Sequence, residues 1–130
     1  MELSGNLTVK FNGDLDVDVT PGSVLRIEGD SDLLPTIHDN SELKLGDHGK
    51  VSLVTVKGGT AHIWGYVKCL DIKTGMACIY PSAKIDIVHL SDSNKATIAF
   101  CNGADPNKYH IEMQIVSNIN PNKEKPNVQN

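Results

Sequence analysis

Hydrophobic and polar residues alternate along most of this chain, in short runs that are separated by turn-forming residues. Residues 7–11, 15–19, 25–28 and 42–45 each place an apolar side chain at every second position. Alternation of this kind predicts strands with one buried face and one face in solvent. The dipeptides that separate or follow the runs favour turns, and they are Asn12-Gly13, Pro21-Gly22, Gly29-Asp30, Gly46-Asp47 and Gly58-Gly59. The pattern therefore predicts an all-β protein.

Patterns that indicate a helix are nearly absent from the sequence. No window of about eleven residues combines apolar positions at i, i+3, i+4 and i+7 with a preceding cap. Only residues 31–38 come near to this pattern, and Pro35 interrupts them. We expect at most one short helical turn, around residues 32–34.

The second half of the chain predicts shorter strands around a narrow interior. Past Val51 the apolar pairs follow one another closely, and small residues recur at the inward positions, namely Ala61, Gly65, Ala77 and Ala96. A sandwich of hairpins usually has longer strands and larger inward residues, whereas a coil that turns every few residues needs short strands and a thin core. We therefore predict a small, imperfect β-solenoid, in which each coil stacks on the next. A small β-sandwich or barrel is the alternative architecture.

The whole chain is short enough to form one domain. It has 130 residues, of which 5% are aromatic, so its core has to be built from Leu, Ile and Val. The last strand is predicted at residues 108–116, so that a single β domain spans residues 1–116. Residues 117–130 are polar, interrupted by prolines and almost free of apolar side chains. We expect this segment to form a mobile C-terminal tail.

Four sequence elements follow one another in a fixed order between residues 13 and 46. They are the alternating run 14–19, the turn Thr20-Pro21-Gly22, the segment GDSDLLPTI at 29–37 and the run 42–45. Their order resembles that of the GIN-domain family, the head domain of a group of auto-transporter adhesins, and the likeness extends more loosely to about residue 100. The resemblance implies a right-handed, β-helix-like stack of coils. It implies no activity, because the family offers no established catalytic residues.

The charge and the hydropathy of the chain argue against several kinds of partner. The formal net charge is −4 and the pI is about 5.6, without a basic stripe. Nucleic acids and acidic membrane surfaces attract basic proteins, so we expect neither as a partner. No apolar run approaches the roughly 20 residues that span a bilayer, so membrane insertion is not expected. The N-terminal residues lack the basic and apolar regions of a signal peptide, which predicts a cytoplasmic protein, or an extracellular one if the chain is a truncated form.

The residue types that most often bind metals are present but are not spaced for it. Cys69, Cys78 and Cys101 form no C-x-x-C motif, and separate thiols are typical of a reducing compartment. No two of the five histidines share the spacing of metal ligands. His38-Asp39 and Asp47-His48 are neighbours in predicted turns, where a local hydrogen bond is the expected contact. We predict neither a metal site nor a cofactor.

Motifs of catalysis are also missing. Asp14, Asp16 and Asp18 project in parallel from one predicted strand, about 6–7 Å apart, and so cannot converge on a calcium ion. We expect them to form a solvated acidic face. The sequence has no GxSxG elbow, no HExxH motif and no phosphate-binding glycine loop. We therefore predict that the protein is not an enzyme.

The segment TAHIWGYVK at residues 60–68 is the most unusual local feature of the sequence. If every second residue of a strand faces inward, then His62, Trp64, Tyr66 and Lys68 project outward together. Tyr80 extends this row if neighbouring coils stack in register. Rows of exposed aromatic residues are typical of binding hot spots. The alternative is that a loop or another subunit covers this face.

We therefore expect a non-enzymatic interaction module that binds a protein or a glycan through this aromatic strand face. Two other functions stay open. The ends of a solenoid expose unpaired strand edges, so a structural protein that self-associates into a homo-oligomer is the first alternative. A phage-type inhibitor that covers a surface of a host defence complex is the second, because small size and acidic charge are compatible with that role.

Overall fold

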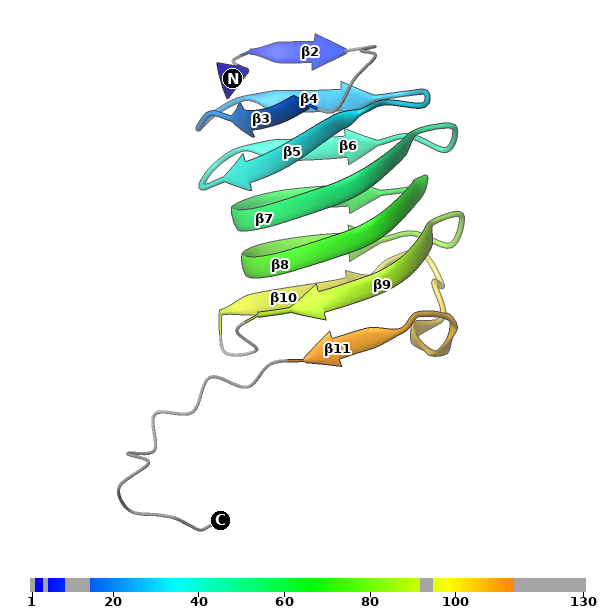
Figure 1. Ribbon diagram of the computed structural model, residues 1–130. Helices are drawn as coiled ribbons and strands as arrows, with labels where there is room; N and C mark the ends of the chain where they lie inside the picture. The colour runs from blue at the N-terminus through cyan, green and yellow to red at the C-terminus, as the bar shows by residue number, and fades with distance from the viewer. Residues whose placement is uncertain (1, 4, 9–14, 92–94, 114–130) are drawn as a thin grey trace, which may run out of the picture.

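The chain folds into a β-solenoid of about 5 turns (Figure 1). The computed structural model describes residues 2–3, 5–8, 15–91 and 95–113, and these contain strands and a single 3-10 turn, Pro106–Lys108, but no α-helix. The prediction of an all-β solenoid is thereby confirmed. The strands are β1 (Glu2–Leu3), β2 (Asn6–Thr8), β3 (Leu15–Val19), β4 (Val24–Ile27), β5 (Leu33–His38), β6 (Glu42–Leu45), β7 (Lys50–Ile63), β8 (Tyr66–Ile79), β9 (Lys84–Leu90), β10 (Ala96–Phe100) and β11 (Ile111–Met113).

The strands form two faces that enclose a thin core. The front face consists of β1, β3, β5, β9, β11 and the first parts of β7 and β8. The back face consists of β2, β4, β6, β10 and the second parts of β7 and β8. Neighbouring strands pair in parallel throughout these faces, because the chain always coils in the same direction. Figure 1 shows a right-handed coil, in which front strands run to the left and back strands run to the right.

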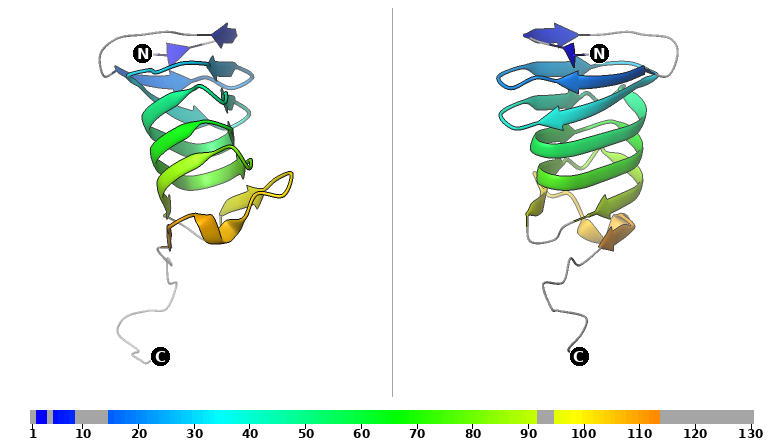
Figure 2. Two further views of the ribbon diagram at one scale, coloured as in Figure 1. Left: turned by 90° about the vertical axis from the view of Figure 1, so that its right-hand side faces the viewer. Right: turned by 60° about the vertical axis from the view of Figure 1, so that its left-hand side comes forward.

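β7 and β8 pass from the front face to the back face without a break. Each is 14 residues long, where the sequence predicted shorter strands past Val51. Both strands bend at a glycine with positive φ, Gly58 at 120° and Gly75 at 96°. Glycine adopts this conformation at little steric cost, so the strand turns the corner and keeps its pairing. The continuous bends are visible in both views of Figure 2.

The core between the two faces is aliphatic, as the composition predicted. In β5 every second residue from Leu33 onward is buried, which is the period of a strand with one inward face. The small residues that were expected to face inward, such as Ala61 and Ala77, are buried as well. The largest fully buried side chains include Leu25, Ile27, Leu33, Ile37, Leu43, Leu45, Ile63, Leu70, Ile72 and Ile79. The aromatic rings of the described residues therefore lie outside this buried set, on the surface or at its margin.

The coils differ in length. Leu15 stands in register with Leu33 of the next coil, whereas Val88 stands in register with Ile111, much further along the chain. The strands keep their pairing, and the turns at the corners take up the difference. A repeat of fixed period is therefore not visible in the sequence.

Residues 32–34, where at most one short helical turn was expected, form no helical turn. β5 begins at Leu33, and Pro35 is a buried strand residue in register with Val17. Registered pairing of β5 with β7 begins only at Thr36. Proline lacks an amide hydrogen, and it is tolerated where a strand has no registered neighbour on one side. Alternating burial, rather than the local helix pattern, therefore decides the conformation here.

The C-terminal end of the described chain also differs from the predicted strand 108–116. The 3-10 turn Pro106–Lys108 includes the predicted first residue of that strand, and β11 begins only at Ile111, while residues 114–116 lie outside the described ranges. Tyr109 packs against Phe100, with ring centroids 5.9 Å apart, and its hydroxyl donates a hydrogen bond of 2.9 Å to the carbonyl oxygen of Ala83. These contacts close the end of the core. The predicted tail 117–130 lies outside the described residues.

Candidate functional site

A corner of the coil divides the outward row that was predicted at residues 62–68. Trp64-Gly65 forms this corner, between the end of β7 and the start of β8. His62 consequently lies on the back face, while Tyr66 and Lys68 lie on the front face. The predicted site residues therefore fall into two groups, and Tyr80, at the end of β8, joins the first of them.

His62, Trp64 and Tyr80 form an aromatic cluster on the outside of the back face, which we call the aromatic patch. The rings of Trp64 and Tyr80 stack with centroids 4.1 Å apart and an interplanar angle of 14°. The ring of His62 lies 5.8 Å from that of Trp64, and its Nδ1 is 3.0 Å from the hydroxyl oxygen of Tyr80. All three side chains are half-buried. The coils do stack so that Tyr80 extends the row of His62 and Trp64.

The backbone explains why Trp64 and Tyr80 stack. The amide of Trp64 donates to the carbonyl oxygen of Leu45 at 2.9 Å, and the amide of Tyr80 donates to that of Ile63 at 3.1 Å. The parallel ladder therefore continues past the strand ends, and equivalent corner residues of adjacent coils lie directly above one another. At this spacing of about 4.8 Å between strands, two flat rings fill the gap between coils.

The surroundings of the patch favour uncharged side chains. Burial lowers the pKa of His62 below its ordinary value of 6.5, and nearby Lys44 lowers it too, while Glu42 acts in the opposite direction. Burial is also the main cause that raises the pKa of Tyr80. At neutral pH the aromatic patch is therefore a flat and neutral surface.

The second group of predicted residues occupies a charged part of the front face. The hydroxyl of Tyr66 donates a hydrogen bond of 2.5 Å to Asp86. The ammonium groups of Lys50 and Lys84 lie 5.5 Å and 5.1 Å from the centre of the Tyr66 ring, since both residues are in register with it. Lys68 is exposed and lines a hollow of about 230 Å³ near Lys50. This group is polar and separate from the aromatic patch.

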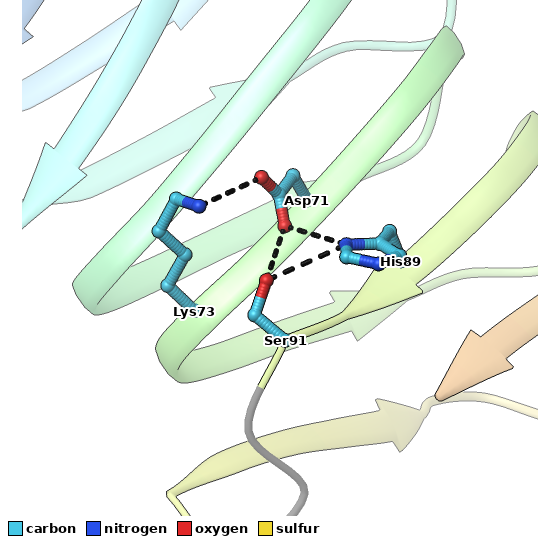
Figure 3. Close-up of polar contacts among 4 residues, drawn as sticks. All are labelled: Asp71, Lys73, His89 and Ser91. Carbon is cyan, nitrogen blue, oxygen red and sulfur yellow. Dashed lines mark hydrogen bonds and ion pairs between the residues drawn. The ribbon is translucent and has the colours of Figure 1, made fainter. Parts of the chain in front are cut away.

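A polar cluster that the sequence did not predict lies on the front face, where Asp71, Lys73, His89 and Ser91 meet (Figure 3). One oxygen of Asp71 lies 3.2 Å from Nδ1 of His89 and accepts a hydrogen bond of 3.0 Å from Ser91. The other oxygen lies 3.3 Å from the ammonium group of Lys73. Burial acts to raise the pKa of Asp71, but the hydrogen bonds from His89 and Ser91 and the charge of Lys73 together lower it.

This cluster contains Ser, His and Asp, but its geometry is not that of a catalytic triad. In a triad the imidazole bridges the carboxylate and the hydroxyl through its two opposite nitrogens. Here the same nitrogen of His89 faces both Asp71 and Ser91, the latter at 3.4 Å, and Ser91 donates directly to the carboxylate. Because Ser91 donates its hydroxyl hydrogen to Asp71, that hydrogen is not directed at the imidazole, which would have to accept it in a triad. We interpret the cluster as a polar brace between β8 and β9.

The acidic strand at residues 14–18 is partly paired with the following coil. Nε2 of His38 lies 2.7 Å from a carboxylate oxygen of Asp18. The sequence predicted a local contact between His38 and its neighbour Asp39. The side chain of His38 instead contacts Asp18 of the neighbouring coil. The pair borders a hollow of about 490 Å³, which Lys57 also lines. Asp14 lies outside the described residues.

Comparison with known proteins gives this chain no family. No family model, no curated protein and no solved structure matches it. In the described ranges, no group of three or more His, Cys, Asp or Glu residues is arranged to hold a metal ion. No helix in the same ranges is long and apolar enough to cross a membrane. The function therefore has to be argued from the surfaces of the solenoid.

Proposed function

We propose that this protein is a non-enzymatic interaction module and that the aromatic patch is its contact surface. The observation that supports the proposal best is the face-to-face stack of Trp64 and Tyr80 on the outside of the coil, with centroids 4.1 Å apart. Trp and Tyr dominate many interfaces because they bury a large area with few rotatable bonds.

The patch is ordered before a partner arrives. Its rings pack on one another, and the contact between His62 and Tyr80 restrains both side chains. Immobilising a free side chain at an interface costs about 0.5–1.5 kcal/mol of conformational entropy. In the aromatic patch much of this entropy is already lost when the chain folds, so less is lost on binding. A neutral and rigid surface also requires little desolvation of charge when it is covered.

The orientation of the rings favours a protein partner over a glycan. Sugars typically stack on the open face of an aromatic ring, but Trp64 and Tyr80 each cover one face of the other. Met76 lies in β8 shortly before Tyr80, on the back face, and it is 38% exposed. Methionine adapts its shape to a protein surface, because its side chain is flexible and polarisable. The proposed partner is therefore a protein with an apolar epitope.

The resemblance of residues 13–46 to GIN-domain heads is in keeping with this proposal. That family offers no catalytic residues, and its members are described as heads of adhesins.

The proposal is tested by replacing one aromatic residue on each face with alanine. Trp64→Ala removes half of the stack, whereas Tyr66→Ala removes an aromatic residue from the front face and is the matched control. A partner captured by the wild-type protein is purified, and its affinity for the three proteins is measured by calorimetry. We expect Trp64→Ala to weaken binding by about 30-fold or more, as removal of a hot-spot residue does.

Tyr66→Ala should change the affinity by no more than about threefold. Circular dichroism must show that both variants keep the fold. If Tyr66→Ala weakens binding and Trp64→Ala does not, the contact surface lies on the front face and the proposal is wrong.

A second candidate function, self-association through the ends of the solenoid, rests on the strand pairing. In the described part of the chain, β10 pairs only with β8 and β11 pairs only with β9. Such terminal strands present unpaired amide and carbonyl groups to another chain. Sedimentation velocity at rising protein concentration tests this function. A single monomer boundary at all concentrations contradicts it, and a boundary that moves faster at higher concentration supports it.

A further inference from the structure

Three sulfur-containing residues occupy neighbouring positions on the back face, beside the aromatic patch. Sδ of Met76 lies 3.7 Å from Sγ of Cys78 on the same strand. Cys101 comes from the next coil, where its amide donates a hydrogen bond of 2.8 Å to the carbonyl oxygen of Ile79. Cys78 is in register with Ala99, so Cys101 lies one outward position further along the adjacent strand.

The two thiols are close neighbours. Burial is the main cause that raises the pKa of the Cys78 thiol to about 11, and the nearby Cys101 contributes to this rise. Cys78 is 8% exposed and Cys101 is half-buried. Cys78 is thus the central member of the group, since it contacts the thioether of Met76 and has Cys101 as its neighbour on the next coil.

The spacing of these atoms suits a metal ion that prefers sulfur. With metal–sulfur bonds of about 2.3 Å, tetrahedral or trigonal ligands lie about 3.8–4.0 Å from one another. The observed distance of 3.7 Å between Met76 and Cys78 is close to this value. Thiolates and thioethers are soft ligands that select Cu(I) among the common cellular metals. Structural Zn²⁺ usually has four Cys, His or carboxylate ligands, a set that the described residues do not bring together.

We propose that Met76, Cys78 and Cys101 form a binding site for one Cu(I) ion. Each cysteine would bind as a thiolate, so loading one Cu(I) releases two thiol protons and leaves the three-sulfur site with a net charge of −1. Cys101 contributes from the next coil, so the ion would tie two coils of the back face together. This inference does not depend on the proposed function: the two share Met76, but none of the three residues of the aromatic patch is a proposed ligand.

The test is an anaerobic titration of the reduced protein with Cu(I) in competition with a chromophoric Cu(I) chelator. We expect one tightly bound Cu(I) per chain, with ultraviolet absorption typical of Cu(I)–thiolate bonds. Cys78→Ser and Cys101→Ser should each lower the affinity by about 100-fold or more, and Met76→Leu by about 10-fold. Ser and Leu nearly keep the size of the original side chains, and circular dichroism checks that the fold is retained.

The chain provides matched controls on its other face. Cys69 lies on the front face and Met113 lies in β11, 63% exposed. Cys69→Ser and Met113→Leu should leave the affinity and the stoichiometry unchanged. The proposal is overturned if the wild-type protein binds no Cu(I), if Cys69→Ser lowers the affinity as much as Cys78→Ser, or if Cys101→Ser has no effect. Displacement of the bound Cu(I) by stoichiometric Zn²⁺ would also overturn it.

Discussion

At the scale of the residue, His62 is the member of the aromatic patch whose charge can change near neutral pH. Its imidazole lies between Trp64 and the hydroxyl of Tyr80, and burial holds its pKa below the ordinary value. In the unfolded chain the same residue is protonated below pH of about 6.5. Protonation therefore favours the unfolded chain, because the folded protein accepts the proton only at a lower pH.

We predict that His62→Gln makes the stability of the protein less dependent on pH. Between about pH 7.5 and about pH 5.5 the wild type loses stability as the pH falls below 6.5, and the variant lacks this contribution. Urea unfolding at the two pH values measures the effect. Gln keeps a polar group beside Tyr80, so the comparison isolates the charge. An equal loss in both proteins would show that other groups cause the pH dependence.

The alternation of apolar and polar residues predicted which residues of a strand face inward and which face outward, and these predictions were correct inside the strands. It placed His62 and Trp64 outward with Ile63 inward, as the structure has them. It could not place the corner at Gly65, because a buried glycine continues the alternation as smoothly as any inward residue. Tyr66 and Lys68 were therefore expected in one row with Trp64, although they project outward from the front face of the solenoid.

At the scale of the element, the corners decide where each strand ends. A Cβ atom on Gly65 would overlap the carbonyl oxygens of Gly46 and Gly49 in the preceding coil. Gly103, in the loop before the 3-10 turn, has open space around it but a positive φ of 87°. Gly65 is therefore required because two coils approach each other closely, whereas Gly103 is required because its backbone adopts a left-handed conformation.

We predict that Gly65→Ala destabilises the protein by about 3 kcal/mol, since the backbone of two coils has to separate. Gly103→Ala should cost only about 1 kcal/mol, the strain of a left-handed alanine. The free energy of unfolding in urea gives both values. A Gly65→Ala variant that is as stable as Gly103→Ala would show that the coils are not packed tightly at this corner.

The sequence could not predict which side chains of successive coils contact one another in the candidate sites. Asp71 and His89 are 18 residues apart, and Asp18 and His38 are 20 residues apart. Each pair meets only because one coil has about this length, and that length changes along the chain. The proximity of Cys78 to Cys101 is hidden for the same reason. A constant repeat would have made all three visible.

At the scale of the whole molecule, the solenoid is a one-dimensional stack. β7 and β8 each pair on both sides, whereas β10 and β11 pair on one side in the described chain. The free energy of unfolding of such a stack is approximately the sum of the stabilities of its coils and of the interactions between neighbouring coils. The centre is consequently held by more interactions than the ends.

We predict that hydrogen exchange is slowest for the core-strand amides of β7 and β8 and fastest, among the strands, for those of β11. The C-terminal coil should open without unfolding the centre, because it loses the contacts of one interface only. Hydrogen–deuterium exchange resolved by NMR or mass spectrometry measures this order. Equal protection in all strands would instead indicate that the protein unfolds in one cooperative step.

The stack of Trp64 on Tyr80 also has an optical consequence. Trp64 is the only tryptophan of the chain, so its fluorescence reports on a single place in the molecule. A phenol ring 4.1 Å away transfers excitation energy efficiently to the indole, and this coupling depends on contact between two successive coils. The native chain therefore carries its own spectroscopic label, without any added dye, at the boundary where the central coils would begin to come apart.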